Sequence, residues 1–461
     1  MIVLIVAAVL VFTRLIWSLI LPWRLFSVST ANLLATLLFV AFGLQYLVVT
    51  DPFVAAVMVC TFYFFLLMGE FIGRAVHVDR PRFAAMGRWF STSQLIFYGF
   101  FIVFWAFCFL PIVNGLASGQ SLSSMIASTW ASNGVGERSA RLVDSIYGRN
   151  VTGIAALLLG IQRQLVGFWY LSIGVLFWRK RKTVYVGLMV FAFGTFATSG
   201  GARSGIIAAI AVIGTLWLLS RTKGKAISLN WKQLAFIALL GVGSLFVLDF
   251  LMAGRTGTTV SGGLIERFDR LMQRDIAYGG LGIDFGTELP PPTYERGADY
   301  LLRLVSGPVP RVLWPGKSTV DANLEMTEAY VGRPIEQIGS IYLFTPIGEA
   351  LFYFGLFGLF LVPFLYGLTT TWLERIYSTS PAYWGLLAQV YVWSLLGMRQ
   401  SFWNLWGALV VANFLLLVFL FLVKSFFSRR KERTARSVPS ESRARASAQL
   451  SEVSIPGQRQ I

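Results

Sequence analysis

Long apolar stretches recur along this chain and constrain its fold more than any other feature. A helix needs about 20 apolar residues to cross the core of a bilayer. Eleven segments approach or exceed this length: Ile2–Ile20, Val28–Val49, Phe53–Ile72, Ser93–Val113, Thr152–Phe177, Val184–Ser199, Gly205–Ser220, Gln233–Met252, Ile341–Leu368, Ala382–Met398 and Phe402–Val423. Because the bilayer core offers the backbone no water to bind, spanning segments of this kind must be helical. We therefore expect an all-α polytopic membrane protein with about eleven transmembrane helices.

The polar intervals divide the chain into regions. Residues 1–252 hold the first eight predicted spans, with a loop at 114–150. Residues 253–340 form the one long polar interval, which we expect to be a large loop with short helices. Residues 341–423 hold the last three spans. Residues 424–461 are polar, basic and serine-rich, a composition typical of a disordered tail.

Basic residues indicate the orientation of these spans. They gather between spans three and four, five and six, and seven and eight, and again in the tail. With eleven spans all four regions fall on one side, which the positive-inside rule makes cytoplasmic. The N-terminus is then outside and the C-terminus is cytoplasmic. The net charge of +17 reflects contact with anionic membrane lipid, and the short, scattered basic segments do not favour nucleic acid as a partner.

Five cations are predicted at the outer ends of the spans. Arg203 and Arg399 lie in very short turns between spans, and Arg255 follows the eighth span in a glycine-rich segment. Arg311 and Lys317 lie in a segment stiffened by three prolines. Guanidinium groups bind phosphate oxygens in bidentate geometry, so a lipid-linked pyrophosphate is a suitable ligand. The alternative is that these cations bind lipid headgroups or cap helix ends.

Other candidate site residues are predicted at a membrane depth close to that of these cations. Arg163, within the fifth span, should face either a substrate cavity or an acidic partner. Glu349 can act as a general base or neutralise an arginine. Trp314, Tyr300 and Trp403 can stack on sugars, although an interfacial aromatic belt explains them equally well.

Nothing in the sequence indicates a metal or a cofactor. No cluster of histidine, cysteine and carboxylate residues suits zinc, and no Asp-x-Asp pair suits a nucleotide-sugar metal. The segment Gly316-Lys317-Ser318-Thr319 is similar to the end of a phosphate-binding loop. However, arginine occupies position 311, where that motif needs its first glycine. We therefore expect metal-independent chemistry.

Three motifs resemble those of bacterial oligosaccharide repeat-unit polymerases, the O-antigen polymerases of the Wzy type. Residues 310–317, Pro-Arg-Val-Leu-Trp-Pro-Gly-Lys, are similar to the Pro-Arg-x-x-Trp-Pro-x-Lys segment of this family. Residues 347–358 resemble its Gly-Glu-Ala…Phe-Gly-x-x-Gly span, and residues 199–204 resemble its arginine turn. The arrangement of many spans with one large late loop covers nearly the whole chain.

The resemblance implies a GT-C-like glycosyltransferase in the bacterial inner membrane. Its substrate would be a polyprenyl-pyrophosphate-linked oligosaccharide, and the growing glycan would be transferred onto the next lipid-linked repeat unit to build O-antigen, capsule or exopolysaccharide. Chain-length regulators or export proteins would be further partners. Arg203, Arg311 and Arg399 would bind pyrophosphate with support from Lys317 and Arg255, and Glu349 would accept the proton of the attacking hydroxyl.

Two alternatives stay open. A polysaccharide ligase uses the same donor with a different acceptor, but lipopolysaccharide ligases typically carry a histidine on the outer face. The single histidine of this chain, His77, lies in a predicted cytoplasmic loop. A flippase or transporter of lipid-linked oligosaccharide would need cations along a full transmembrane path. Here the cations gather at the outer ends of spans.

Overall fold

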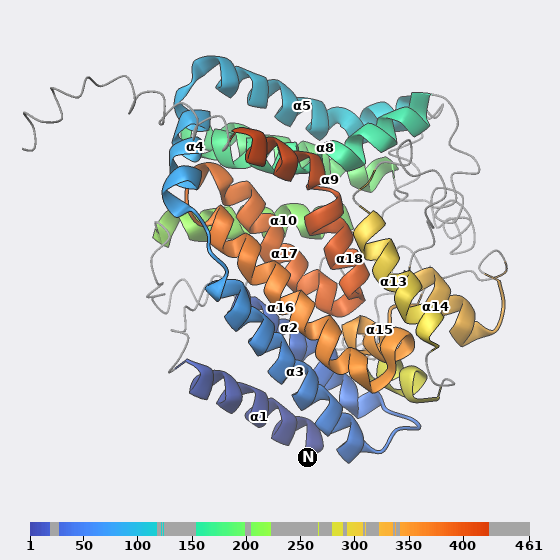
Figure 1. Ribbon diagram of the computed structural model, residues 1–461. Coiled ribbons are helices and arrows are strands. Elements are labelled where there is room, and N and C mark those ends of the chain that lie inside the picture. The colour runs from blue at the N-terminus through green and yellow to red at the C-terminus, as the bar shows by residue number, and fades with distance from the viewer. Residues whose placement is uncertain are drawn as a thin grey trace, which may run out of the picture.

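The computed structural model describes residues 1–18, 27–117, 121, 123, 154–198, 204–222, 266, 279–288, 293–307, 309, 322–334, 337 and 342–423. Within these helices, the side chains of residues 114, 117, 154–164, 196–198 and 204–207 are not described. The described residues are helical with short connections and include no strand. Figure 1 shows most of the long helices running from one end of the molecule to the other.

The described elements follow the apolar segments of the sequence. Their bounds are α1 (Ile2–Trp17), α2 (Val28–Thr36), η1 (Leu37–Ala41), η2 (Phe42–Tyr46), α3 (Pro52–Ala75), α4 (Arg80–Thr92), α5 (Gln94–Ala117), α8 (Ile154–Arg179), α9 (Arg181–Thr198), α10 (Ser204–Thr222), α13 (Tyr294–Ser306), α14 (Ala322–Val331), α15 (Thr345–Phe354), η4 (Gly355–Phe357), α16 (Gly358–Tyr377), η5 (Pro381–Tyr383), α17 (Trp384–Gln400), α18 (Phe402–Trp406) and η6 (Gly407–Val411). Residues 279–288 and 414–423 are also helical. Ten of the predicted spans therefore lie on helices, and the eighth, Gln233–Met252, lies outside the described residues.

The chain is a helical membrane protein. Within its described part, five helices are long and apolar enough to cross a bilayer: Val28–Tyr46, Pro52–Ala75, Gln94–Val113, Thr345–Tyr377 and Phe402–Val423. Shorter apolar helices occur at Ile2–Trp17, Leu165–Arg179 and Ala208–Arg221. Their lipid-facing character is visible on α1, where Leu4 and Phe12 are exposed while Leu10 is buried.

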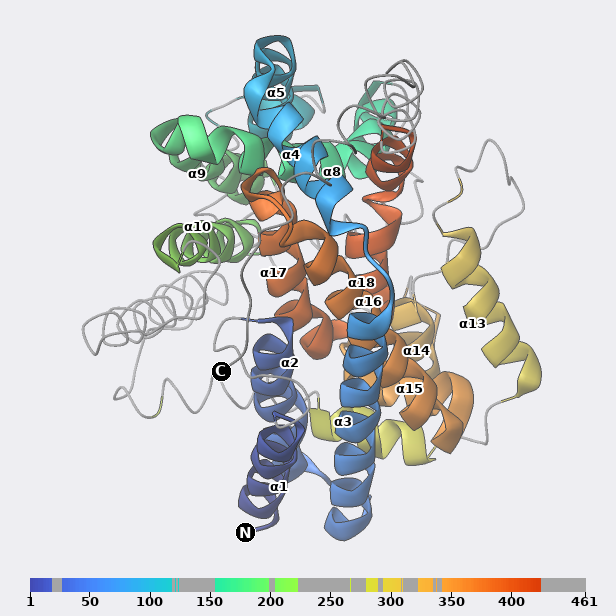
Figure 2. The same ribbon diagram turned by 60° about the vertical axis from the view of Figure 1, so that its left-hand side comes forward.

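The central helix pair is α3 with α16. The start of α3 is fixed by Asp51, whose side chain accepts hydrogen bonds from the backbone N–H groups of the first turn, and by Pro52. Gly69 and Gly73 then form a Gly-x-x-x-Gly face against α16, and Gly367 of α16 meets α3 in return. A Cβ atom at Gly69 would overlap the carbonyl oxygen of Phe364, so only glycine permits this approach. Figure 2 shows the two helices side by side.

Buried polar groups tie α2 to this pair. Glu70 of α3 is fully buried and accepts hydrogen bonds from Ser29 and from Asn32 at 2.9 Å. At the end of α3, Arg375 of α16 donates to backbone carbonyl groups, including that of Gly73 at 3.2 Å. These contacts satisfy charged groups inside the bundle, as burial requires, and they assign Glu70 a structural role.

The predicted ninth span, Ile341–Leu368, overlaps the apolar helical segment Thr345–Tyr377, which is bent and not straight. The helix α15 begins at Thr345 and ends at Phe354, where Gly355 takes φ 59°. The chain then folds back so closely that a Cβ atom at Gly358 would overlap the carbonyl oxygen of Ala350. Glycine adopts positive φ without steric cost, which allows this sharp break. Glu349 therefore lies near the start of a short separate helix and not partway down a straight span.

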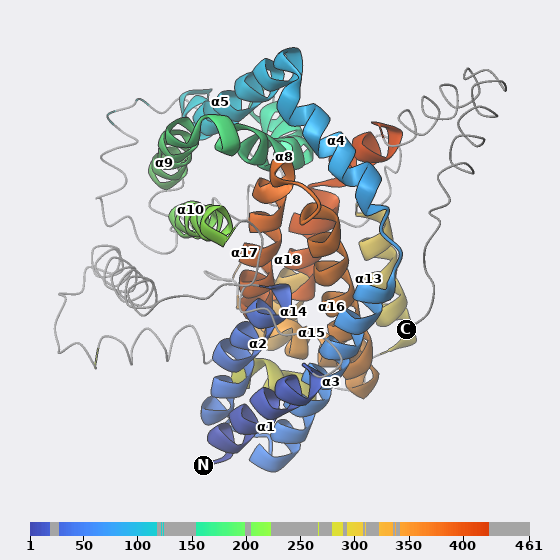
Figure 3. The same ribbon diagram turned by 90° about the vertical axis from the view of Figure 1, so that its left-hand side faces the viewer.

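The two ends of the bundle differ. One end carries α13, α14, the start of α15 and the turn between α17 and α18; we call it the α13 end (Figure 1). The opposite end carries α4, which packs against η5 through Gly87 and Ser380. Figure 3 shows α5, α8 and α9 gathered together and away from α1 and α3. The helix α17 contacts α8 in the first group and also contacts α2 and α16, of which α16 packs on α3.

Candidate active site at the α13 end

An amphipathic helix, α13, forms one wall of the candidate site. It begins at the N-cap Thr293, whose hydroxyl accepts a hydrogen bond from the backbone N–H of Arg296 at 3.3 Å. Its buried face is Gly297, Tyr300, Arg303 and Leu304, the three-to-four-residue spacing of one helix face. The far end is held by α18, because the indole N–H of Trp406 donates to the carbonyl oxygen of Leu304 at 2.9 Å.

Glu349 lies at the centre of the site and is fully buried. Its Oε1 accepts hydrogen bonds from the hydroxyl of Tyr300 at 2.8 Å and from the backbone N–H of Trp403 at 3.1 Å. Its Oε2 accepts the backbone N–H of Phe402 at 2.5 Å. The first N–H groups of a helix have no partner within that helix, and a carboxylate there is favourable. Glu349 thus joins α13, α15 and the start of α18.

Arg399 lies close to the start of α18, where Glu349 binds, both in the sequence and in the fold. It is in the last turn of α17, two residues before the N-cap Ser401. The Ser401 hydroxyl accepts the backbone N–H of Asn404 at 3.1 Å and contacts the side chain of Asn323 at 3.4 Å. The turn that carries Arg399 is therefore fixed both to α18 and to α14.

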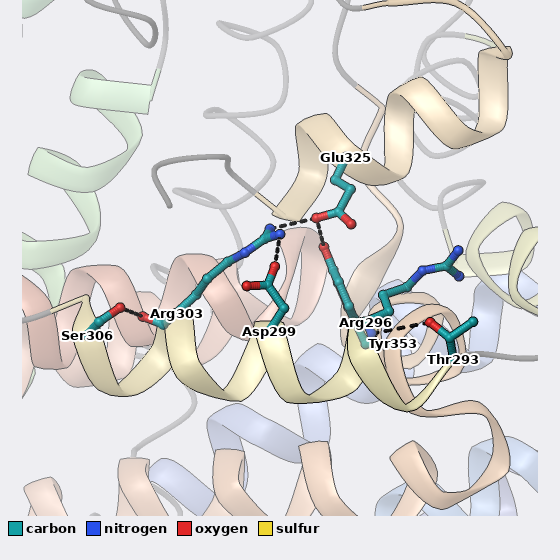
Figure 4. Close-up of polar contacts among 7 residues, drawn as sticks. All are labelled: Thr293, Arg296, Asp299, Arg303, Ser306, Glu325 and Tyr353. Carbon is teal, nitrogen blue, oxygen red and sulfur yellow. Dashed lines mark hydrogen bonds and ion pairs between the residues drawn. The ribbon is translucent and has the colours of Figure 1, made fainter. Parts of the chain in front are cut away.

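A second carboxylate, Glu325 of α14, lies in an ion-pair network on the same side (Figure 4). Its Oε2 accepts hydrogen bonds from Arg303 Nη1 at 2.6 Å and from the Tyr353 hydroxyl at 3.0 Å. Arg303 also pairs with Asp299 one turn earlier on α13. Burial alone would lower the pKa of Arg303, but the hydrogen bonds and charges of Glu325 and Asp299 outweigh it and raise that pKa. The guanidinium therefore stays charged.

The two carboxylates are linked through neighbouring aromatic rings. Tyr300, which binds Glu349, and Tyr353, which binds Glu325, have ring centroids 4.4 Å apart. Trp403 lies 6.2 Å from Tyr300. Tyr300 is 1% exposed, so its ring offers no open face to a sugar and its hydroxyl instead orients Glu349. Trp403 is partly buried, and its stacking on a sugar stays a prediction.

The structure brings together those predicted residues whose side chains it describes. Glu349 and Tyr300 are in direct contact, and Arg399 belongs to the turn that meets Glu349. Arg163 lies on α8, but its side chain is not among those described. The remaining predicted site residues lie outside the described residues: Arg203, Arg255, Arg311, Trp314 and Lys317.

The Arg303 network is the feature that the sequence prediction missed. A charged residue at 303 interrupts the apolar face of α13, and an aspartate lies four residues before it, which is the spacing of a helical ion pair. That pattern signals a buried ion pair. The sequence offers no comparable signal for Glu325, because its contact with Arg303 depends on how α14 packs. No protein-family model, curated protein or solved structure matches this chain.

Proposed function

We propose that this protein is a metal-independent membrane glycosyltransferase that polymerises lipid-linked oligosaccharide repeat units. The observation that best supports this proposal is the convergence of distant segments at the α13 end. Glu349 of the Gly-Glu-Ala motif, Tyr300 and the turn carrying Arg399 meet there. A charged, hydrogen-bonded site at one end of a membrane-embedded bundle suits a substrate whose lipid lies in the bilayer and whose sugars lie outside it.

The proposed topology has eleven spans in a GT-C-like arrangement, with residues 233–252 as the eighth span. The α13 end then faces the outer side of the bacterial inner membrane and α4 faces the cytoplasm. In support, α4 carries exposed Arg82 and Arg88, and the connection between α8 and α9 carries exposed basic residues at 179–182. Such residues are enriched on the cytoplasmic side of membrane proteins.

The proposed reaction is a glycosyl transfer at an anomeric carbon. A hydroxyl oxygen of the incoming repeat unit forms a bond to the anomeric carbon of the growing chain. The bond from that carbon to the pyrophosphate oxygen breaks, and polyprenyl pyrophosphate leaves with the electron pair. Arg399, with Arg203, Arg255, Arg311 and Lys317, would stabilise the charge that develops on the leaving group. The proton of the hydroxyl passes to a carboxylate.

The role of Glu349 in this scheme follows from its contacts. Two backbone N–H groups and a phenol already bind its oxygens, and it is fully buried. Both oxygens are therefore occupied by donors that hold α13 and the start of α18 in place. The sequence leaves two roles open for Glu349, proton acceptor or partner of positive charge. These contacts do not favour the role of proton acceptor and instead support a role in stabilising the site.

Reconstitution tests the proposal. The purified protein in proteoliposomes, supplied with its polyprenyl-pyrophosphate-linked repeat unit, should produce a ladder of longer glycans on a gel. Arg311→Ala should weaken this ladder by about 100-fold if that guanidinium stabilises the leaving group. Transfer to a different acceptor without a ladder would indicate a ligase, and movement of repeat units across the membrane without elongation would indicate a flippase.

A further inference from the structure

We propose that Glu325 is the general base of this site and that it accepts the proton of the attacking sugar hydroxyl. This inference rests on the proposed glycosyl transfer and names the group that completes it. Such a base must be ionised, fixed in position and open to the substrate on one oxygen. The described carboxylates at the α13 end differ in how they are fixed and in which of their oxygens are engaged.

Two carboxylates there are fully engaged by the backbone. Both oxygens of Glu349 bind N–H groups at the start of α18. Both oxygens of Asp284 bind N–H groups of the turn that leads into α3, those of Val48 at 2.7 Å and Thr50 at 2.9 Å. Each holds a helix start or a turn in place, and neither presents a free oxygen to an incoming group.

Glu325 differs because its two donors share one oxygen. Arg303 and Tyr353 both bind Oε2. Among the described residues, Oε1 takes part in no hydrogen bond or ion pair, and the side chain is 27% exposed. Figure 4 shows this second oxygen directed away from Arg303 and Tyr353. The carboxylate is thus fixed by two contacts at one oxygen, while its other oxygen meets no donor among the residues that the structure describes.

One guanidinium, that of Arg303, is shared between two carboxylates, those of Glu325 and Asp299. Asp299 is the weaker candidate for the base. Its side chain is 44% exposed and its ion pair lies within a single helix, so no contact with the membrane bundle orients it.

Glu325 is also connected to the rest of the site. Tyr353 joins it to α15, the helix that carries Glu349, and the ring contact between Tyr353 and Tyr300 continues this connection to α13. The ion pair with Arg303 brings α13 and α14 together at the two ends of the sequence segment that contains Arg311 and Lys317. A base at this position therefore lies beside the buried site around Glu349.

The test compares Glu325→Gln with the wild-type protein in the elongation assay. Loss of a general base should lower kcat by about 100- to 10,000-fold. The KM for the lipid-linked repeat unit should change by less than about threefold, because the amide keeps an acceptor for Arg303. Glu295→Gln, which removes an exposed carboxylate from the first turn of α13, is the matched control and should retain wild-type kcat.

A second variant separates chemistry from structure. In Glu325→Ala, added formate can occupy the vacated space and accept the proton. Formate should therefore raise the kcat of this variant by at least about tenfold. Formate should have no effect on wild-type protein or on Glu295→Gln.

Three results would overturn the assignment. Glu325→Gln within threefold of wild-type kcat would show that no proton passes to this group. Failure of formate to raise the activity of folded Glu325→Ala would assign Glu325 to structure alone. Absence of elongation by wild-type protein would contradict the proposed function, and the base assignment would fall with it.

Discussion

At the scale of single residues, carboxylates of the same site have different roles according to their partners. Both oxygens of Glu349 accept hydrogen bonds from backbone N–H groups, and a phenol binds one of them, whereas the described donors to Glu325 all bind one oxygen. Both are glutamates in the region that carries the family-like motifs. From the sequence alone, Glu349 is a stronger candidate for a site residue than Glu325, because only Glu349 lies in a recognisable motif. The sequence carries no information on which carboxylate oxygens are engaged.

Removal of the Glu349 carboxylate should destabilise the protein. In Glu349→Ala, the backbone N–H groups of Phe402 and Trp403 lose their acceptor, and each unpaired buried group costs about 1–3 kcal/mol. We expect a clear fall in the thermal unfolding midpoint in detergent, with Glu349→Gln less affected because it keeps one acceptor oxygen. The exposed Glu295→Ala serves as control. Equal midpoints for Glu349→Ala and wild type would show that α18 does not depend on this carboxylate.

At the scale of elements, apolar length predicts where helices lie but not how they pair. Ten of the predicted spans lie on described helices because a bilayer imposes helical structure on any long apolar segment. The break at Gly355 escaped prediction, since hydropathy is continuous across it while the backbone turns at φ 59°. The contact between α13 and α14 was likewise not predictable, because 22 residues separate Arg303 from Glu325 and neither periodicity nor composition encodes it.

The close approach of α3 and α16 gives an element-scale prediction. Gly69→Ala places a Cβ atom on the carbonyl oxygen of Phe364, and overpacking of this kind costs about 1–3 kcal/mol. Gly99→Ala in α5 is a matched control, because its Cβ atom would meet nothing within 4 Å. We expect Gly69→Ala to lower the unfolding midpoint in detergent and Gly99→Ala to leave it unchanged or higher. A similar midpoint for both variants would contradict the glycine-mediated packing.

At the scale of the whole molecule, the two ends of the bundle have different chemistry. The α13 end holds buried carboxylates, tyrosines and an arginine network, while the α4 end holds exposed basic residues. This difference between the two ends is expected from the sequence, because the large loop and the basic connections fall on opposite sides of the predicted spans. In the proposed topology, these two ends lie on opposite sides of the membrane.

Site-directed labelling tests this orientation. Single cysteines replace Tyr294, which is 91% exposed on α13, and Arg82, which is exposed on α4, in a background without Cys60 and Cys108. A membrane-impermeant maleimide should label the cysteine at position 294 in intact spheroplasts. It should label the cysteine at position 82 only after permeabilisation. The reverse pattern would place the α13 end in the cytoplasm and contradict the proposed site of synthesis.

The most direct test of the central claim is the stoichiometry of carrier release. Proteoliposomes with purified protein receive repeat units whose polyprenyl pyrophosphate is radiolabelled, and glycan length and free carrier are measured together. Polymerisation predicts one polyprenyl pyrophosphate released for each repeat unit added, with release lost in Arg399→Ala. Elongation without release of the carrier, or release without elongation, would contradict transfer from polyprenyl pyrophosphate as the reaction of this protein.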